Sequence, residues 1–431
     1  MADASFIIRG LGIGQGGKRT LRGEIAVGGA KNAALKVMAA AALFEDSVEL
    51  ANVPEIEDVN RMAELLEGTG MKIEKAAGRR KILLPRSPAK LDPDLPNGPA
   101  KAMRSSIVLT GPMLARMGRV TFPNPGGCSF GNRPIDLFLE GFKRFGAQIE
   151  TVGEDYVVTA PGGLKGMEFF FKVQSHTGTE TLMMAATLAK GRTVLKNCAL
   201  EPEVKSLADY LNACGARISG AGTSTIVIDG GEPLSSRGRV YETMPDRIET
   251  GSFMILGALA GEKVVVKRCE PAHLEILTEI LRTAGVRVEL GAGEITVYGA
   301  DSFVAGNVRT HEYPGLATDL QSPIAVLLTQ SMGESALFET IYEGRLAYIK
   351  DLIGMGADIE VQDTHRVLVR GPKPLVGRTL RAPDLRAGFA FVIAAIIAKG
   401  ESRIDNAYVI DRGYEKIVER LTKLGVDIKR G

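Results

Sequence analysis

Apolar and polar residues follow a fixed order along this chain. The alanine-rich residues 32–44 are almost uniformly apolar and predict a helix, and residues 47–53 then predict a strand. Residues 58–70, DVNRMAELLEGTG, place apolar side chains at helical spacing and end in glycine, which is typical of a surface helix. Alternating segments such as 216–220 and 224–230 predict a closing pair of strands.

The same order recurs along the whole sequence. Six related phrases, TGMKIE, FGAQIE, CGARIS, AGVRVE, MGADIE and LGVDIK, each end a predicted surface helix. Their aligned glycines are Gly70, Gly146, Gly215, Gly285, Gly356 and Gly425. Successive glycines are 76, 69, 70, 71 and 69 residues apart, so the sequence predicts an α/β protein of six βαβ-type repeats, each of about 70 residues.

The two ends of the chain complete each other. The sixth repeat stops at Gly431 without its last strand, whereas residues 6–10, FIIRG, have the form of the closing strands in other repeats. Residues 21–27, LRGEIAV, then lead into the first helix as LKGMEFFF leads into the third. We therefore expect the first strand to complete the last repeat.

This closure predicts two lobes of three repeats each. The continuous lobe would contain residues 30–244, and the discontinuous lobe residues 1–29 and 245–431. The chain would cross twice, near Ala30 and near Pro245. We expect these crossings to form a hinge beside a cleft, which is a common place for a small-molecule site.

Composition excludes several classes of partner. Apolar residues make up 45% of the chain, and 53 basic residues face 51 acidic ones, so no excess of positive charge favours nucleic acid or a membrane surface. This balance argues against a sliding clamp and against relatives of the RNA 3′-phosphate cyclases, which are built from similar units.

The segment GLGIGQGG near the start of the chain imitates the glycine-rich fingerprint of dinucleotide-binding proteins. In that fingerprint a helix follows the glycines, whereas here a predicted strand follows, so we interpret the segment as a turn.

The four cysteines show no metal-binding or disulfide spacing. We therefore predict no metal and no cofactor, and we expect Cys198, Cys214 and Cys269 to be buried thiols.

The first ten residues lack the basic flank and long apolar core of a secretory signal, and the longest apolar run is too short to span a bilayer. These features predict a cytoplasmic protein.

The second repeat carries an insertion that contains the remaining cysteine. The link from strand to helix spans six positions from Asn52 to Asp58 in the first repeat, but twelve from Asn124 to Asp136 in the second. The extra residues, within PNPGGCSFGNRP, are rich in glycine and lack apolar periodicity, so we predict a surface loop. Within it, the thiol of Cys128 would be acidified by a nearby arginine and would suit proton transfer or nucleophilic attack.

Charged residues also stand at predicted helix starts. Lys31, Asn32 and Arg104 open the first helices of repeats one and two, where free N–H groups and a basic side chain favour a phosphate or carboxylate. Acidic residues open the corresponding helices of later repeats, and we expect N-capping to explain two of these three: Asp246, Asp319 and Asp384.

Together these segments resemble one family, the UDP-N-acetylglucosamine 1-carboxyvinyltransferases. The resemblance rests on GGAKNAAL, KAMRSSI, PGGCSFGNRPIDL, TLMMAATLA, PDRIETGSF, TDLQ, DLRAG and IDRGYEKI, in this order over nearly the whole chain. It implies a two-lobed inside-out α/β barrel, the enolpyruvyl transferase fold. It also implies transfer of the enolpyruvyl group of phosphoenolpyruvate to the 3′-hydroxyl of UDP-N-acetylglucosamine, with release of phosphate. This reaction begins peptidoglycan precursor synthesis, and so bears on cell wall biogenesis, cell shape, the cell cycle and cell division.

The resemblance also implies roles for individual residues. Cys128 would donate a proton to phosphoenolpyruvate, and Asp319 would accept the proton of the 3′-hydroxyl. Phosphoenolpyruvate would be held by Lys31, Asn32, Arg104, Arg133, Arg386 and Arg412, with Lys31 and Arg412 also catalytic. The sugar nucleotide would be held by Asn32, Arg104, Arg133, Pro134, Ile135, Asp136, Leu137, Ser175, Asp319 and Ile341.

Three residues depart from the family pattern. His176 and Thr177 follow Ser175 where a small apolar residue and glycine are usual, and Gly344 precedes Arg345 where asparagine is common. These positions face the nucleotide in the family, so a modified sugar nucleotide stays an alternative acceptor. Shikimate 3-phosphate, the acceptor of the sister family, is a second alternative, although that family has a Gly-Ser-Lys-Ser type of first motif and no cysteine loop.

Overall fold

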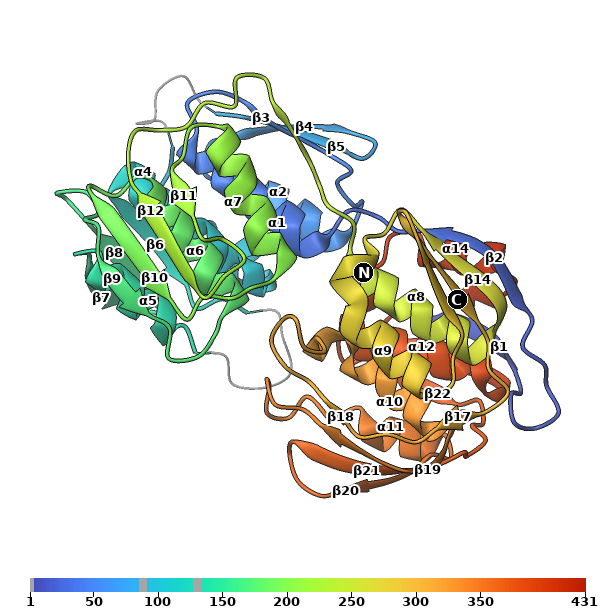
Figure 1. Cartoon of the computed structure of the whole chain (residues 1–431). Helices are drawn as coiled ribbons and strands as arrows, with labels where there is room; N and C mark the ends of the chain where they lie inside the picture. Colours follow the sequence, from blue (N-terminus) through green and yellow to red (C-terminus); the bar gives the residue numbers. More distant parts are fainter. Residues whose placement is uncertain (1–3, 85–90, 127–133) are drawn as a thin grey trace. The chain divides into compact units, whose positions relative to one another are not determined.

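The computed structural model describes residues 4–84, 91–126 and 134–431. These residues divide into two units that are each internally packed (Figure 1). The continuous unit contains the described residues between 29 and 244, and the discontinuous unit contains residues 4–28 and 245–431. Each unit has its own hydrophobic core.

The continuous unit is built from short strands and helices. Its helices are α1 (Lys31–Ala40), η1 (Ala41–Leu43), α2 (Glu57–Gly68), α3 (Asn97–Ala102), η3 (Arg104–Leu109), α4 (Thr110–Met117), α5 (Asp136–Arg144), α6 (His176–Thr187) and α7 (Pro202–Ala213). Its strands are β3 (Val48–Ala51), β4 (Lys72–Ala76), β5 (Arg79–Leu83), β6 (Arg119–Pro123), β7 (Gln148–Val152), β8 (Asp155–Thr159), β9 (Glu168–Phe170), β10 (Arg192–Lys196), β11 (Ile218–Ser219), β12 (Thr225–Asp229) and β13 (Val240–Glu242).

The discontinuous unit has the same kinds of element. Its helices are α8 (Arg247–Ala260), η4 (Pro271–Leu274), α9 (Glu275–Thr283), η5 (Thr318–Leu320), α10 (Gln321–Thr329), α11 (Ile349–Gly354), α12 (Leu385–Ile397), α13 (Tyr408–Asp411) and α14 (Ile417–Lys423). Its strands are β1 (Phe6–Leu11), β2 (Leu21–Ala26), β14 (Gly261–Lys267), β15 (Val288–Gly291), β16 (Glu294–Tyr298), β17 (Phe303–Val304), β18 (Val308–Arg309), β19 (Ser331–Phe338), β20 (Asp358–Val361), β21 (Arg366–Gly371), β22 (Thr379–Arg381), β23 (Lys399–Asp405) and β24 (Asp427–Arg430).

Each repeat contributes one small sheet, and the described strands form six sheets, three in each unit. The strand orders in the continuous unit are β13-β3-β5-β4, β6-β8-β7 and β11-β12-β10-β9. In the discontinuous unit they are β15-β16-β14-β2, β17-β19-β21-β20 with β18 beside β19, and β22-β23-β1-β24. The prediction of six βαβ-type repeats, three to a unit, is confirmed by this arrangement.

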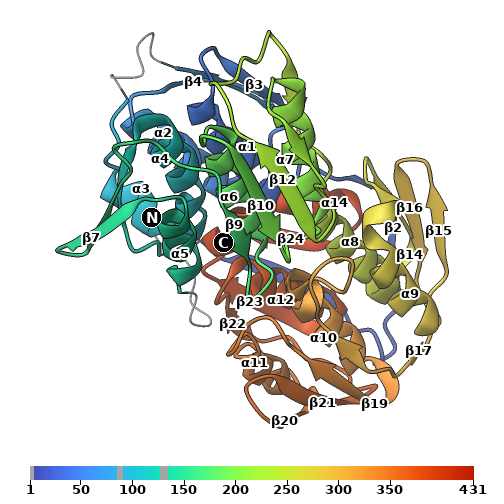
Figure 2. The same ribbon diagram turned by 60° about the vertical axis from the view of Figure 1, so that its left-hand side comes forward.

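The first helix of each repeat in the discontinuous unit lies inside the unit. Every residue of α8 and α10 is buried, and these two helices and α12 pack against one another. Figure 2 shows the sheet of β14, β15 and β16 beside α8 and α9, and the sheet of β19, β20 and β21 beside α10 and α11. Helices that are apolar on all sides must be buried, which explains their uniform sequences and the inside-out arrangement.

The six aligned glycines end the surface helices in a left-handed conformation. Their φ angles lie between 91° at Gly70 and 112° at Gly215. A residue with a Cβ atom is strained at such angles, whereas glycine adopts them freely and closes the helix. The glycine that marks the repeat in the sequence is therefore required by the backbone at this point.

The first strand of the chain lies within the sheet of the last repeat. β1 pairs antiparallel with β23, with Phe6 opposite Ile404, and antiparallel with β24, with Phe6 opposite Arg430. It thus occupies the place that β16 holds between β14 and β15. The sequence prediction that residues 6–10 close the sixth repeat is confirmed.

The chain passes from one unit to the other after β2 and after β13. On the discontinuous side, the N–H of Asp246 donates to the carbonyl of Gly28 at 3.0 Å, and the N–H of Gly28 donates to Glu249 at 3.0 Å. On the continuous side, the N–H of Ala30 donates to the carbonyl of Met244 at 2.6 Å. Within each unit, the two passages are therefore joined to each other by hydrogen bonds.

Other sequence expectations can be checked in the same structure. Cys198, Cys214 and Cys269 are buried, as predicted. The glycine-rich segment before β2 forms a turn with positive φ at Gly12 and Gly14, which agrees with the sequence interpretation. Within the described ranges, no helix is long and apolar enough to cross a membrane.

Candidate active site

Lys31 is the first residue of α1, and its ammonium group faces a buried carboxylate. Lys31 Nζ lies 2.8 Å from Asp58 Oδ2, which belongs to α2. The two side chains are 11% and 2% exposed. The charge of Asp58 offsets the cost of burying the ammonium group, which keeps a cation at the start of this helix. Asn32 is the next residue and is partly buried.

Arg104 opens η3, and its guanidinium contacts two separate parts of the chain. One terminal nitrogen donates to the carbonyl of Pro125 at 3.1 Å, and the other to the carbonyl of Pro134 at 3.4 Å. Between these prolines lies the segment with Cys128 and Arg133, two predicted site residues that fall outside the described residues. Arg104 therefore joins the chain on both sides of that segment.

The remaining predicted residues of the continuous unit lie at helix starts. Pro134 is exposed, Ile135 is buried, and α5 begins at Asp136, which is exposed, with Leu137 partly buried behind it. Ser175 caps α6, because its hydroxyl accepts a hydrogen bond from the N–H of Gly178 at 3.0 Å. This capping is a structural role for Ser175 whether or not it also binds a ligand.

Asp319 lies between two buried arginines in the discontinuous unit. Its Oδ1 accepts a hydrogen bond from Arg345 at 2.8 Å, and its Oδ2 accepts one from Arg386 Nε at 3.1 Å. Both arginine side chains are 5% exposed, whereas Asp319 is 28% exposed. The carboxylate is therefore fixed in orientation and still reachable by solvent.

Both arginines are held firmly in their charged form. Burial is the largest single effect and lowers the pKa of Arg345 and of Arg386, but the negative charge of Asp319 and the further acidic groups nearby together outweigh it and leave both pKa values above the ordinary value. The guanidinium of Arg386 also lies over the ring of Tyr414, 5.6 Å from its centroid. The carboxylate of Asp319 is therefore surrounded by positive charge.

Two more predicted residues belong to this unit. Ile341 follows β19 and is partly buried, and its backbone N–H donates to Glu339 Oε1 at 2.8 Å. Arg412 directly follows α13 and is also partly buried. Among the predicted residues that the structure describes, contacts join Asp319 to Arg386 and Arg104 to Pro134.

The expectation about acidic helix starts is confirmed. Asp246 caps α8 by accepting from the N–H groups of Ile248 and Glu249, and Asp384 caps α12 in the same way. The side chain of Asp319 instead binds arginines. Capping therefore explains two of the three, and Asp319 is the exception.

Sequence reasoning missed the charged partners of the predicted residues. The sequence pattern places Arg345 beside Gly344, and it places Asp58 at the end of the segment that joins strand and helix in the first repeat. It does not indicate that Arg345 pairs with Asp319 or that Asp58 pairs with Lys31. The available signal was a charged residue inside an apolar surrounding, as at Arg345 in GRLAYI. That signal marks a buried charge but does not say which residue lies opposite.

Two of the residues that depart from the family pattern, Gly344 and His176, have different structural explanations. Gly344 has a φ of 72°, a conformation that glycine and asparagine adopt more readily than other residues, so backbone geometry explains both residue types there. His176 instead faces inward, with Nε2 3.2 Å from Glu180 Oε1, while Lys36 Nζ lies 3.0 Å from Glu180 Oε2. His176 thus belongs to a buried charge cluster.

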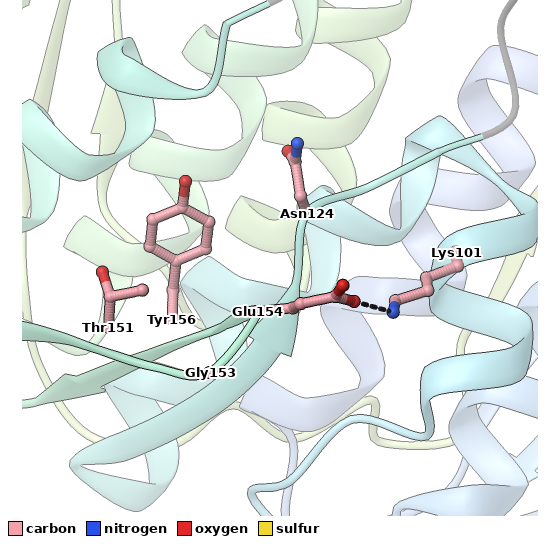
Figure 3. Close-up of a pocket in the computed structure, with 6 residues that line it drawn as sticks. All are labelled: Lys101, Asn124, Thr151, Gly153, Glu154 and Tyr156. Atoms are coloured by element: carbon pink, nitrogen blue, oxygen red, sulfur yellow. Dashed lines mark hydrogen bonds and ion pairs between the residues drawn. The ribbon is translucent and has the colours of Figure 1, made fainter.

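A cavity of about 460 Å³ also lies in the continuous unit. It is lined by Lys101, Asn124, Thr151, Gly153, Glu154 and Tyr156. Figure 3 shows the ion pair between Lys101 and Glu154, with 2.8 Å between Nζ and Oε2. Both of these side chains are well exposed, and the lining includes none of those predicted catalytic or binding residues that the structure describes. We therefore assign the chemistry to the groups described above.

Comparison with known proteins gives the family. Residues 16–421 match the family model described as EPSP synthase (3-phosphoshikimate 1-carboxyvinyltransferase). A UDP-N-acetylglucosamine 1-carboxyvinyltransferase from Koribacter versatilis is 42% identical over 428 residues, covering 99% of this chain and 96% of the relative. One from Anaeromyxobacter dehalogenans (strain 2CP-C) is 44% identical over 411 residues, covering 95% and 97%.

Solved structures show the same fold. The enolpyruvyl transferase NikO from Streptomyces tendae is similar with a TM-score of 0.87 and 24% identity, covering 100% of this chain and 99% of that one. The EPSP synthase from Acinetobacter baumannii gives a TM-score of 0.73 at 20% identity, covering 99% and 100%. With its repeats, its fold and its full-length relatives taken together, the chain belongs to the UDP-N-acetylglucosamine 1-carboxyvinyltransferase family of enolpyruvyl transferases.

Proposed function

We propose that this protein transfers the enolpyruvyl group of phosphoenolpyruvate to the 3′-hydroxyl of UDP-N-acetylglucosamine and releases phosphate. The observation that carries the proposal is the identity of 42 to 44% with relatives of that activity over nearly the full length. The match to the EPSP synthase model supports enolpyruvyl transfer in general, whereas these relatives support the sugar nucleotide as acceptor.

Cations at several positions suit a donor that carries two anionic groups. We propose that Lys31, Arg104, Arg133, Arg386 and Arg412 neutralise its phosphate and carboxylate, with Asn32 as a further contact. Lys31 and Arg386 are both buried, and each forms an ion pair with a carboxylate, Lys31 with Asp58 and Arg386 with Asp319. Such fixed charges stabilise a reaction in which positive character develops at the central carbon between two anionic groups.

The addition step needs an acid and a base. Cys128 would give its proton to the methylene carbon of phosphoenolpyruvate, while the 3′-hydroxyl oxygen attacks the central carbon and its proton passes to Asp319. A tetrahedral adduct results. In elimination, the Cys128 thiolate would take a proton from the new methyl group and the bond from carbon to phosphate oxygen would break, which restores the thiol and the double bond and frees phosphate. The held orientation and partial exposure of Asp319 support its role as base.

The acceptor would bind through residues at helix starts. We propose that Arg133, Pro134, Ile135, Asp136, Leu137 and Ser175 contact the sugar nucleotide, together with Asn32, Arg104, Asp319 and Ile341. The exposed start of α5 at Asp136 and the capped start of α6 are compatible with this assignment. Because backbone conformation explains Gly344, that departure gives no reason to expect a modified acceptor.

The proposed setting is the cytoplasm, where this reaction would supply the first committed intermediate of peptidoglycan. Loss of the activity would then impair cell wall biogenesis and, through it, cell shape, the cell cycle and cell division. A conditional depletion strain checks this role, because it should round up and lyse unless the wild-type chain is supplied.

The decisive assay measures phosphate release from phosphoenolpyruvate with no acceptor, with UDP-N-acetylglucosamine, and with shikimate 3-phosphate. We expect release only with the sugar nucleotide, together with a product of matching mass. Release with shikimate 3-phosphate alone would assign the chain to the other acceptor, and release with neither would contradict the proposed function.

A further inference from the structure

Glu339 directly follows β19, and the roles proposed above do not involve it. It is fully buried, with 0% exposure. Its Oε1 accepts hydrogen bonds from the backbone N–H of Ile341 at 2.8 Å and of Tyr342 at 3.2 Å. Its Oε2 accepts one from the hydroxyl of Thr318 at 2.8 Å. One carboxylate therefore contacts two segments of the chain.

Both segments carry residues of the proposed acceptor side. Thr318 is the first residue of η5 and directly precedes Asp319, the proposed base. Ile341 is a proposed contact of the sugar nucleotide, and the chain continues from it to Arg345, which donates to Asp319 at 2.8 Å. The contacts from Glu339 and from Arg345 thus hold the Asp319 segment from two directions.

The backbone of Glu339 is also fixed. Its N–H donates to the carbonyl of His365 at 2.8 Å, and its carbonyl oxygen lies 2.7 Å from His365 Nδ1. The backbone N–H of the next residue, Thr340, donates to the hydroxyl of Thr310 at 2.9 Å. Because the main chain is held on both sides, the carboxylate is a rigid reference point for the two segments.

We infer that Glu339 is a positioning residue that sets the distance between the base Asp319 and the Ile341 segment that binds the acceptor. The inference rests on the proposed function, because it assigns a purpose to a contact within the same site. A buried carboxylate needs its hydrogen-bond donors, so the two segments lose a shared anchor when it is removed. Misplacement of a catalytic group by about 1 Å can cost about 10²-fold in rate.

Shape and charge can be separated at this residue. In Glu339→Gln, the amide oxygen can accept from both backbone N–H groups, and the amide nitrogen can donate to the Thr318 hydroxyl, which also accepts. We therefore expect Glu339→Gln to retain most of the wild-type kcat, whereas Glu339→Ala should lower kcat about 10²-fold. A large loss in both variants with unchanged KM values would indicate a role of the charge and would overturn the positioning role.

The Thr318 hydroxyl allows a more conservative test. We expect Thr318→Val to lower kcat about tenfold, in proportion to one hydrogen bond, and Thr318→Ser to restore it. The KM for phosphoenolpyruvate should stay at the wild-type value in both. Combining Thr318→Val with Glu339→Ala should add little to Glu339→Ala alone, because both remove the same contact. Thr340→Val is the matched control, since it removes a hydroxyl contact in the same turn that does not reach Thr318.

The outcomes separate this inference from the proposed function. If the wild type turns over UDP-N-acetylglucosamine and Thr318→Val equals it in kcat, the positioning role is wrong and the function stands. If the wild type shows no turnover, hydrogen exchange still decides the positioning role. Thr318→Val should then speed exchange of the Ile341 and Tyr342 amides relative to Thr340→Val, and equal exchange in the two variants would overturn the inference.

Discussion

Arg386 Nε lies 3.1 Å from Asp319 Oδ2, although the two residues are 67 positions apart in the sequence. Each stands near the start of the first helix of its repeat, so equivalent places in two repeats supply the two partners. The contact fixes the carboxylate in one orientation. It also means that any change at Asp319 alters the surroundings of a buried cation.

A test of Asp319 should therefore use a replacement of the same size and shape, such as asparagine. We expect Asp319→Asn to lower kcat by about 10²- to 10⁴-fold, because an amide cannot accept the hydroxyl proton. Phosphoenolpyruvate binding, measured by calorimetry, should be largely retained. Asp363→Asn, in an exposed turn, is the control. Turnover near the wild-type rate in Asp319→Asn would rule out Asp319 as the base.

The pair of Lys31 and Asp58 allows stability and chemistry to be separated. Lys31→Met should lower the free energy of unfolding by on the order of 3 kcal/mol, because the cation beside a buried carboxylate is removed. Adding Asp58→Asn should recover most of this loss in urea titrations. We expect phosphate release to stay low in the double variant. Recovery of turnover together with stability would mean that Lys31 has only a structural role.

The thiols should differ in reactivity. Burial raises the pKa of Cys198 to about 12 and that of Cys269 to about 11, and it also raises the pKa of Cys214. At pH values near 8, the thiolate fraction of Cys269 is about 10⁻³, so alkylation there is slow. An epoxide that bears a phosphonate should label Cys128 first, as read by peptide mapping. Labelling spread evenly over the four cysteines would contradict this assignment.

Cys128 can also be tested by exchanging one acid for another. We expect Cys128→Asp to retain turnover with a shifted pH optimum, because a carboxyl group can still deliver the proton. Cys128→Ala should lose about 10²- to 10⁴-fold in kcat. The pH profile of kcat separates the two cases. A fully active Cys128→Ala variant would show that the thiol takes no part in proton transfer.

Stability should depend on pH through His176. Burial is the largest single effect and lowers the pKa of His176, and the charge of Lys36 lowers it further. The charge and hydrogen bond of Glu180 and the charge of Glu201 together outweigh both, so the pKa lies above 6.5. Stabilisation by the charged imidazole is therefore complete below about pH 6.5 and is lost as the pH rises through the raised pKa. The stability difference between wild type and His176→Gln should shrink as the pH rises above 6.5. A difference that grows with pH would show that the pKa is lowered.

The sequence alone determined the repeat and its closure. The left-handed glycine that ends each surface helix is a local backbone requirement, so its recurrence is visible in the printed chain. Hydrophobic periodicity is local as well, and it identified residues 6–10 as the strand that completes the sixth sheet. The resemblance to a family then identified the candidate residues, because these residues lie in short motifs that occur in the same order in this sequence as in the family.

Only the tertiary structure decided which charges meet. Arg345 and Asp319 are 26 residues apart, Lys31 and Asp58 are 27 apart, and no periodicity links the members of either pair. A charged residue beside apolar ones has the same local pattern whether its partner is water or a buried ion, and the choice depends on how separate helices pack. The carboxylate of Glu339 shows this most clearly, because its three donors come from two segments that only the folded chain brings together.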